Sequence, residues 1–354
     1  MNLEDLGWGP FFEAHTETME KQGWRPARVV RTSSNLCTVH TGDGERLAET
    51  SGSLKHKTLT QHELPAIGDW VGVQERDGKR AIIHHVLPRR SHFSRKEVTR
   101  TEEQVLAANV DVAFLVSALD GGRNFNVRRM ERYLSLAWDS RAEPVIVLNK
   151  IDLSEDVEAF TRDLEAVASG SPVIPVSAVT GDGIDALQAY LPYGVTGVFL
   201  GSSGVGKSSL INALIGDEEV DVGEIRGADS RGRHTTTHRE LLVLPNGGLI
   251  IDTPGLREVQ LWADEEAVSR SFADIEEIAE SCRFSDCGHE TEPGCAVKEA
   301  IERGDLDESR LSGYLKLQRE VRHLIRKKDH RAAQVEKAKW KQIQKQFRNR
   351  VKER

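Results

Sequence analysis

The chain lacks any apolar run that approaches the roughly 18 residues needed to cross a membrane as a helix. Its first residues, 1–7, carry acids instead of a basic stretch, and no apolar segment follows them, so we expect no secretory signal. Cysteine is also scarce, since Cys37 stands alone and the other three crowd into one short segment, which is no framework for disulfides. These absences argue against a membrane or secreted protein, and we expect a cytoplasmic one.

What the chain does have is an ordinary globular composition, with 38% apolar and 29% charged residues. Its 354 residues exceed what one hydrophobic core usually organises. Changes in sequence texture predict an N-terminal lead-in at 1–24, a β-barrel at 25–98, an α/β domain at 99–262 and a C-terminal domain at 263–354. We expect a multidomain protein that acts as a monomer and has no membrane partner.

Short β runs broken by Gly and Asp characterise the predicted barrel. They are Ala27–Val30, Leu36–Val39, Asp69–Val73 and Ala81–Val86. A closed, all-β barrel of the oligonucleotide-binding (OB) type suits about 70 residues, although other small barrels fit the same pattern. Basic residues in an expected loop at 55–57, and at 89–90 and 95–96, would suit a nucleic-acid surface, but ordinary solvated loops look the same.

Alternating strands and helices begin near Thr101 and indicate an α/β domain. Strands are expected at 110–116, 144–148, 173–176 and 195–200, helices at 127–138, 155–167 and 209–215, and a hairpin at 241–244 and 249–251. One strand leads directly into Gly201–Ser208, which matches G-x-x-x-x-G-K-[ST] at every fixed position. This spacing predicts a phosphate-binding loop, in which Lys207 reaches the β- and γ-phosphates and Ser208 ligates Mg²⁺.

A second motif, Asn149-Lys-Ile-Asp152, directly follows the strand expected at 144–148. Ligands bind beyond the carboxyl ends of parallel strands, so the Asp152 carboxylate can accept two hydrogen bonds from guanine that adenine cannot offer. Ser177 and Ala178 follow the next strand, where a backbone N–H can meet the guanine O6.

A third group of residues suggests a loop that responds to nucleotide. The polar stretch 216–233 precedes His234-Thr-Thr-Thr237, and a threonine here, for which we favour Thr236, can complete Mg²⁺ coordination. The strand expected at 249–251 ends in Asp252-Thr-Pro-Gly255. Asp252 is predicted to hold the Mg²⁺ shell through water, and the Gly255 N–H to sense the γ-phosphate.

Together these motifs form the set found in GTPases, with base recognition placed before the phosphate loop, so the domain looks circularly permuted. Permutation is tolerated where native termini lie close together. The predicted GTP-binding residues are Asn149, Lys150, Ile151, Asp152, Ser177, Ala178, Gly201, Ser202, Ser203, Gly204, Val205, Gly206, Lys207, Ser208, Ser209 and Gly255.

Cys282, Cys287, His289 and Cys295 predict a zinc site. Three thiolates and an imidazole fill a tetrahedral shell and leave no position for a reacting water, so we expect one structural zinc per chain. Beyond it, the mostly helical segment 313–354 holds 15 Lys or Arg against 4 acids, whereas the whole chain carries a net charge of −8. A basic tail favours a polyanion such as RNA, although a solvated helix face has the same composition.

These residues resemble one family over nearly the full length: ribosome small subunit-dependent GTPase A (RsgA/YjeQ), a circularly permuted GTPase of bacterial ribosome assembly. The resemblance implies an OB barrel, a permuted GTPase domain and a zinc domain. It implies that GTP is hydrolysed to GDP and phosphate on the small ribosomal subunit. It also implies binding to rRNA late in subunit maturation, stimulation of hydrolysis by the subunit, and release.

Leu256 stands where many GTPases have a glutamine that orients the attacking water, a substitution that the family shares. Something else must position that water, and His234 is our candidate catalytic residue beside Lys207, although His234 could equally be an rRNA or loop contact. A GTP-dependent RNA-binding scaffold with little turnover stays open as the alternative function.

Overall fold

The computed structural model of the chain describes residues 1–33, 36–58, 61–76, 79–96, 103–121, 124–216, 239–252, 268–269, 271–284, 287–290, 292–308, 310–319 and 321. The chain divides into two compact units, residues 1–261 and 262–354. Within the described residues, no helix has both the length and the apolar character that a membrane span needs.

The strands are β1 (Arg25–Thr32), β2 (Cys37–His40), β3 (Glu45–Thr50), β4 (Trp70–Arg76), β5 (Arg80–Val86), β6 (His92–Lys96), β7 (Glu103–Ala108), β8 (Val112–Ala118), β9 (Glu143–Asn149), β10 (Val173–Pro175), β11 (Thr196–Gly201), β12 (Arg239–Val243) and β13 (Leu249–Asp252). The α-helices are α1 (Pro10–Glu13), α2 (Glu17–Gln22), α3 (Gly52–Lys57), α4 (Val127–Asp139), α5 (Val157–Glu165), α6 (Ile184–Gln188), α7 (Lys207–Ile215), α9 (Ala273–Ala279) and α10 (Ala296–Arg303). Short 3₁₀ helices are η1 (Glu4–Leu6), η2 (Gln61–Glu63) and η3 (Ile151–Leu153).

Five strands of the first unit close into a barrel in the order β1-β2-β3-β5-β4, because β4 also pairs with β1. Strands β3 and β5 run parallel and the other neighbours antiparallel. Small and β-branched side chains fill the interior, namely Ala27, Val29, Val39, Ala48, Val71, Val73, Ala81 and Ile83. Closure leaves no free strand edge, and the predicted OB-type barrel is confirmed.

Three features in and next to the barrel differ from the sequence-based expectation. Strand β3 was not predicted, because Ala48 is its only buried residue and no apolar run marks it. Residues 55–57 were expected in a loop, but they end helix α3, whose start is capped where Ser51 Oγ accepts a hydrogen bond from the Leu54 N–H at 3.1 Å. The hairpin of β6 and β7 was also missed.

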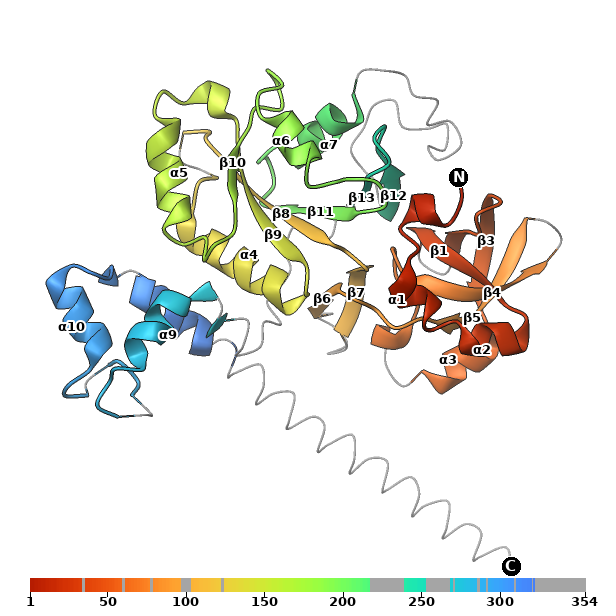
Figure 1. The fold of residues 1–354 in the computed structure, drawn as a ribbon, viewed down its shortest axis with the longest axis horizontal. Helices are drawn as coiled ribbons and strands as arrows, with labels where there is room; N and C mark the ends of the chain where they lie inside the picture. Colours follow the sequence, from red (N-terminus) through yellow and green to blue (C-terminus); the bar gives the residue numbers. More distant parts are fainter. Residues whose placement is uncertain are drawn as a thin grey trace, which may run out of the picture. The chain divides into compact units, whose positions relative to one another are not determined.

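The sheet continues beyond the barrel as β12-β13-β11-β8-β9-β10, in which every pair except β12 and β13 is parallel. Central strand β8 is buried along its whole length, as both faces are covered. Ala113 and Leu115 pack on the side of α4 and α5, whereas Phe114 and Val116 pack on the side of α6 and α7 (Figure 1). The carboxyl ends of β8, β9 and β11 therefore share one edge, where an α/β sheet binds its ligand.

Barrel and parallel sheet are joined by hydrogen-bonded strands. Strand β12 pairs antiparallel with β1, which places Arg31 opposite Glu240 and Thr32 opposite Arg239. The Arg31 guanidinium lies 2.6 Å from the Glu240 carboxylate across this junction. The two parts thus form a single eleven-stranded sheet.

Buried Arg28 of β1 reinforces this junction. Its guanidinium donates to the carbonyl oxygens of Leu6, Gly68 and Asn109, and to Thr196 Oγ1 at 2.9 Å. Burial lowers the pKa of Arg28 to about 10, so the side chain stays charged at neutral pH. One cation thereby ties the N-terminal lead-in and the barrel to the first residue of β11.

The second unit is built from α9, α10 and a helical stretch at 310–319. Arg310 joins two of them, since its guanidinium pairs with the Asp274 carboxylate at 2.5 Å and lies over the Phe272 ring. Leu317 and Val321 are buried in this unit. Most of the basic tail lies outside the described residues.

Candidate functional site

The phosphate-loop motif occupies the turn between β11 and α7, with strand before and helix after as predicted. Gly201, Gly204 and Gly206 have φ angles of 154°, 86° and 98°, a region that side chains disfavour. Backbone N–H groups at the start of α7 therefore lie at the sheet edge, where the helix dipole adds positive charge. Ser203, Gly204, Ser208 and Ser209 are exposed there, as a ligand-binding loop requires.

Lys207 is held against the backbone of its own loop. Its ammonium group donates to the carbonyl oxygens of Gly201 and Ser202, each at 2.7 Å. These two bonds hold the ammonium group inside the loop. In this position Lys207 can act as a point charge that binds phosphate oxygens.

The base motif lies directly against the phosphate loop, although about fifty residues of chain separate them. Asn149 Nδ2 donates to the Val205 carbonyl at 2.8 Å, while Asn149 Oδ1 accepts from the Ala178 N–H at 3.2 Å. Lys150, in the left-handed region at φ 66°, donates from Nζ to the Gly204 carbonyl at 2.7 Å. Buried Asn149 thus joins three ligand-binding segments into one site.

Asp152 is oriented by the segment that follows β10, which contains Ser177 and Ala178. Ser177 Oγ donates to Asp152 Oδ1 at 2.5 Å and accepts from the N–H groups of Val179 and Thr180 at 3.3 and 3.1 Å. The Ile151 N–H donates to the Val176 carbonyl at 3.2 Å, which fixes the start of the turn. Leu153 at the end of η3 and Val179 after β10 are exposed to solvent, with exposed fractions of 65% and 83%. They offer apolar surface beside a carboxylate, which suits a planar base.

Three predicted positions fall outside the described residues: His234, Thr236 and Gly255. Asp252, the fourth member of that group, is the exposed last residue of β13. β13 pairs parallel with β11, so Asp252 comes at the same edge of the sheet as the phosphate loop.

Sequence reasoning missed three residues that follow β8, namely Asp120 and Asn124 before α4 and Arg129 in the first turn of α4. Asp120 Oδ2 accepts from Asn124 Nδ2 at 2.5 Å and from Lys150 Nζ at 3.4 Å, and these donors hold the pKa of Asp120 below its usual value against the effect of burial. Arg129 Nη1 donates to Ser202 Oγ at 2.5 Å. The available signal was positional, because β8 ends beside β11 and polar residues after it must lie near the phosphate loop.

Gly206→Ala is expected to disrupt the base and phosphate motifs together. A Cβ at Gly206 would lie 2.2 Å from Asn149 Nδ2, so either the loop or Asn149 must move. We expect nucleotide affinity to fall roughly tenfold or more, from loss of a buried hydrogen bond and added strain. Equilibrium binding of a fluorescent guanine nucleotide would measure this.

The matched control is Gly216→Ala, since Gly216 also has a positive φ, of 80°, but a Cβ there meets nothing within 4 Å. This variant carries the backbone strain without the collision. Equal affinities for the two variants would show that the contact with Asn149 does not matter.

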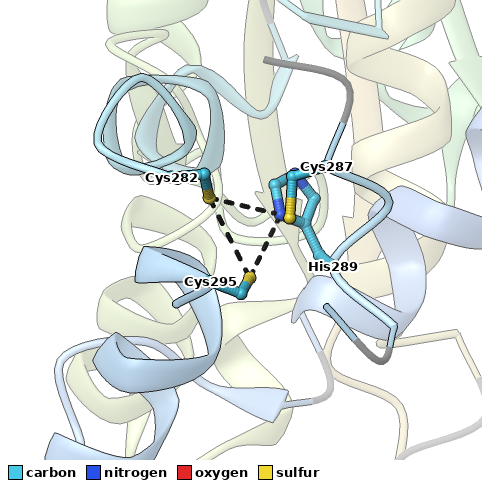
Figure 2. Close-up of side chains that lie close together, drawn as sticks. All are labelled: Cys282, Cys287, His289 and Cys295. Atoms are coloured by element: carbon cyan, nitrogen blue, oxygen red, sulfur yellow. Dashed lines mark hydrogen bonds between the residues drawn. The ribbon is translucent and has the colours of Figure 1, made fainter. Parts of the chain in front are cut away.

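The second unit holds the metal cluster. One ligand atom from each of Cys282, Cys287, His289 and Cys295 lies within 4.8 Å of all the others, and Figure 2 shows them converging on a common centre. Cys282 Sγ lies 3.9 Å from Cys295 Sγ, and His289 Nδ1 lies 3.4 Å from Cys295 Sγ. Tetrahedral zinc with Zn–S bonds of about 2.3 Å separates two sulfurs by about 3.8 Å. The cluster therefore fits a structural zinc, as predicted.

The local chain explains how these ligands meet. Cys282 follows α9, Cys295 is the N-cap of α10, and the loop between them carries the other two. His289 takes a left-handed backbone conformation, with φ 56°, which turns the loop back toward the helices. Burial lowers the pKa of His289 and so favours the neutral imidazole that binds metal.

Models of known protein families match two stretches of the chain. The RsgA GTPase matches residues 86–262, and the 50S ribosome-binding GTPase matches residues 196–348. The small ribosomal subunit biogenesis GTPase RsgA of Opitutus terrae is 47% identical, over 97% of this chain and 96% of that protein.

Two solved structures are similar in fold. YjeQ from Thermotoga maritima has a TM-score of 0.63 and 33% identity, and the match covers 84% of this chain and 98% of that one. YloQ, described as a circularly permuted GTPase, has a TM-score of 0.57 and 27% identity over 85% of this chain and 96% of its own.

Proposed function

The chain belongs to the RsgA GTPase family, and from this premise we propose that it hydrolyses GTP to GDP and phosphate in the biogenesis of the small ribosomal subunit. The observation that carries the proposal is the contact between the two motifs, through Asn149 and Lys150, at one edge of the sheet. A site of this kind reads the base and holds the phosphates at once.

The choice of subunit needs an argument, because one of the two matching families is named for the 50S particle. That match starts at residue 196, so it leaves out the barrel and the base motif. Relatives named for the small subunit match almost the whole chain, with 43% identity over 98% of it in a second example, from Syntrophotalea carbinolica. The small subunit is therefore the better supported partner.

Guanine recognition is assigned to Asp152, whose carboxylate can accept from the N1–H and the exocyclic amine. Ser177 orients that carboxylate, and the guanine O6 is assigned to the Ala178 N–H. The Lys150 stem and Val179 can cover the two faces of the ring. Adenine lacks the matching donors, so GTP is preferred over ATP.

Phosphate binding is assigned to Lys207 and the N–H groups of residues 203–209. Ser208, Thr236 and Asp252 would hold Mg²⁺, which neutralises charge on the β- and γ-phosphates when it is bound. His234 is our candidate for orienting the attacking water, since Leu256 has no polar group. We propose that the subunit orders this region, so that the free protein turns over slowly.

The basic tail at 313–354 is proposed to contact rRNA, and the zinc unit to hold the base of that tail. The protein is proposed to act as a cytoplasmic monomer late in subunit maturation, with domain boundaries near residues 25, 99 and 263. None of these roles requires a membrane partner.

Purified small subunits are expected to stimulate GTP hydrolysis. If the subunit positions a general base, the gain should be on the order of 100-fold. Phosphate release would be measured at saturating GTP and Mg²⁺, for the protein alone and with small subunits. Large subunits serve as the matched control, and Lys207→Ala shows how much hydrolysis comes from contaminants.

The outcomes separate the two functions left open. Stimulation by small subunits alone supports the hydrolase. GTP-dependent binding to the subunit with unchanged hydrolysis would support the RNA-binding scaffold instead. Equal stimulation by large subunits would contradict the assigned partner.

A further inference from the structure

The first turn of α4 brings a cation to the phosphate loop from outside the recognised motifs. This inference rests on the proposed GTPase function. We propose that Arg129 is a further catalytic residue, which leaves Ser202 when GTP binds and stabilises the γ-phosphate during hydrolysis.

Arg129 lies beside the phosphate loop. Its backbone is fixed in the first turn of α4, where its N–H donates to the capping Asn126 side chain at 2.9 Å. Its guanidinium lies 2.5 Å from Ser202 Oγ, while the Ser202 carbonyl accepts from Lys207 Nζ at 2.7 Å. Two cations thus contact Ser202 of the phosphate loop, Arg129 at its hydroxyl and Lys207 at its carbonyl oxygen. The Arg129 side chain is only half-buried, and it is long enough for its guanidinium to move away from Ser202.

The positive charge of Arg129 is not balanced by a carboxylate in the described residues. Several other arginines of the fold form ion pairs with carboxylates, for example Arg89 with Asp69 at 2.7 Å and Arg310 with Asp274 at 2.5 Å. Throughout the ranges that the structure describes, no carboxylate forms an ion pair with Arg129. Its partner there is the neutral hydroxyl of Ser202.

A phosphate oxygen is a better acceptor than this hydroxyl. Hydrogen bonds to an ionised acceptor are roughly twice as strong as neutral ones, and the planar guanidinium fits two phosphate oxygens. Exchange of Ser202 for the γ-phosphate is therefore favourable. GDP has no γ-phosphate, so the contact should distinguish the two nucleotides.

The chemical step needs this charge. The water oxygen forms a bond to the γ-phosphorus as the bond from that phosphorus to the β–γ bridging oxygen breaks. GDP leaves with the electron pair, and the water gives up a proton to a base or to solvent. Arg129 transfers no proton; it stabilises negative charge on the γ-phosphoryl oxygens and on the leaving group, the role an arginine has in other phosphoryl transfers.

The test compares Arg129→Gln with Arg128→Gln in the full-length protein. Glutamine at 129 keeps a neutral donor but loses the charge, while Arg128 is the exposed neighbour and controls for net charge. One charge-assisted hydrogen bond corresponds to a loss of roughly 10- to 100-fold in kcat. We expect that loss for Arg129→Gln, near-normal kcat for Arg128→Gln, and partial recovery for Arg129→Lys.

Nucleotide affinity separates catalysis from loop bracing. Arg129→Gln should weaken a non-hydrolysable GTP analogue several-fold and leave GDP nearly unchanged. Equal weakening of both ligands would show that Arg129 only braces the loop and would overturn the proposal, as would a kcat equal to that of Arg128→Gln. A wild-type protein that binds no GTP would instead refute the proposed function.

Discussion

Replacing Cys295 by alanine is expected to unfold the C-terminal unit and abolish its zinc binding. Cys295 is 3% exposed, is the N-cap of α10 and shares the cluster with Cys282, which follows α9, and with two ligands of the intervening loop. Structural zinc in small domains contributes roughly 10–16 kcal/mol of apparent binding free energy, whereas whole domains are stable by only about 5–15 kcal/mol. A three-ligand site cannot hold this unit together.

Metal analysis and limited proteolysis would measure the effect. Wild-type protein should contain about one zinc per chain, and the variant should lose it and be cut within residues 262–354. Cys37→Ala is the matched control, because Cys37 lies in β2 of the barrel and outside the cluster. Guanine nucleotide binding should survive in both variants. Unchanged zinc content in Cys295→Ala would contradict the site.

Asp152→Asn is expected to change nucleotide specificity. The carboxylate accepts two donors of guanine, and an amide would place its own donor against one of them. A site built around such hydrogen bonds rejects a mismatched ligand strongly, so we expect GTP affinity to fall roughly 100- to 1,000-fold. Xanthosine triphosphate should gain affinity, because it presents an acceptor where guanine has its amine.

Competition binding with GTP, xanthosine triphosphate and ATP would test this expectation. Glu155→Gln, three residues away and exposed, removes the same charge without touching the predicted base contact. Similar losses in the two variants would mean that net charge, not recognition, was changed. Equal binding of ATP and GTP by the wild type would refute the assignment of guanine to Asp152.

The motif positions were predictable from sequence because each follows an apolar strand that is buried on both faces. Val112–Val116 and Pro144–Leu148 are continuous apolar stretches, and the structure has β8 and β9 there. The rule that ligands meet at the carboxyl ends of such strands then groups the motifs. Cysteine spacing identified the metal cluster in the same way.

Other features carry no local signal. Strand β3 carries three charged residues and has Ala48 as its single buried residue, so its pairing with β5 depends on closure of the barrel. The bond from Asn149 to Val205 spans 56 residues, and that from Arg129 to Ser202 spans 73. Such contacts depend on the order of strands in the sheet, which a permuted chain obscures. The roles of His234 and Thr236 stay predictions.

The pairing of β1 with β12 means that the barrel is not a detachable module. Cutting the chain after the barrel would leave β12 with an open edge and separate Arg31 from Glu240. It would also take Thr196 and Asn109 away from Arg28, and leave a buried cation short of acceptors. A barrel transplanted alone would inherit this cost, so the barrel and the nucleotide-binding sheet depend on each other for stability.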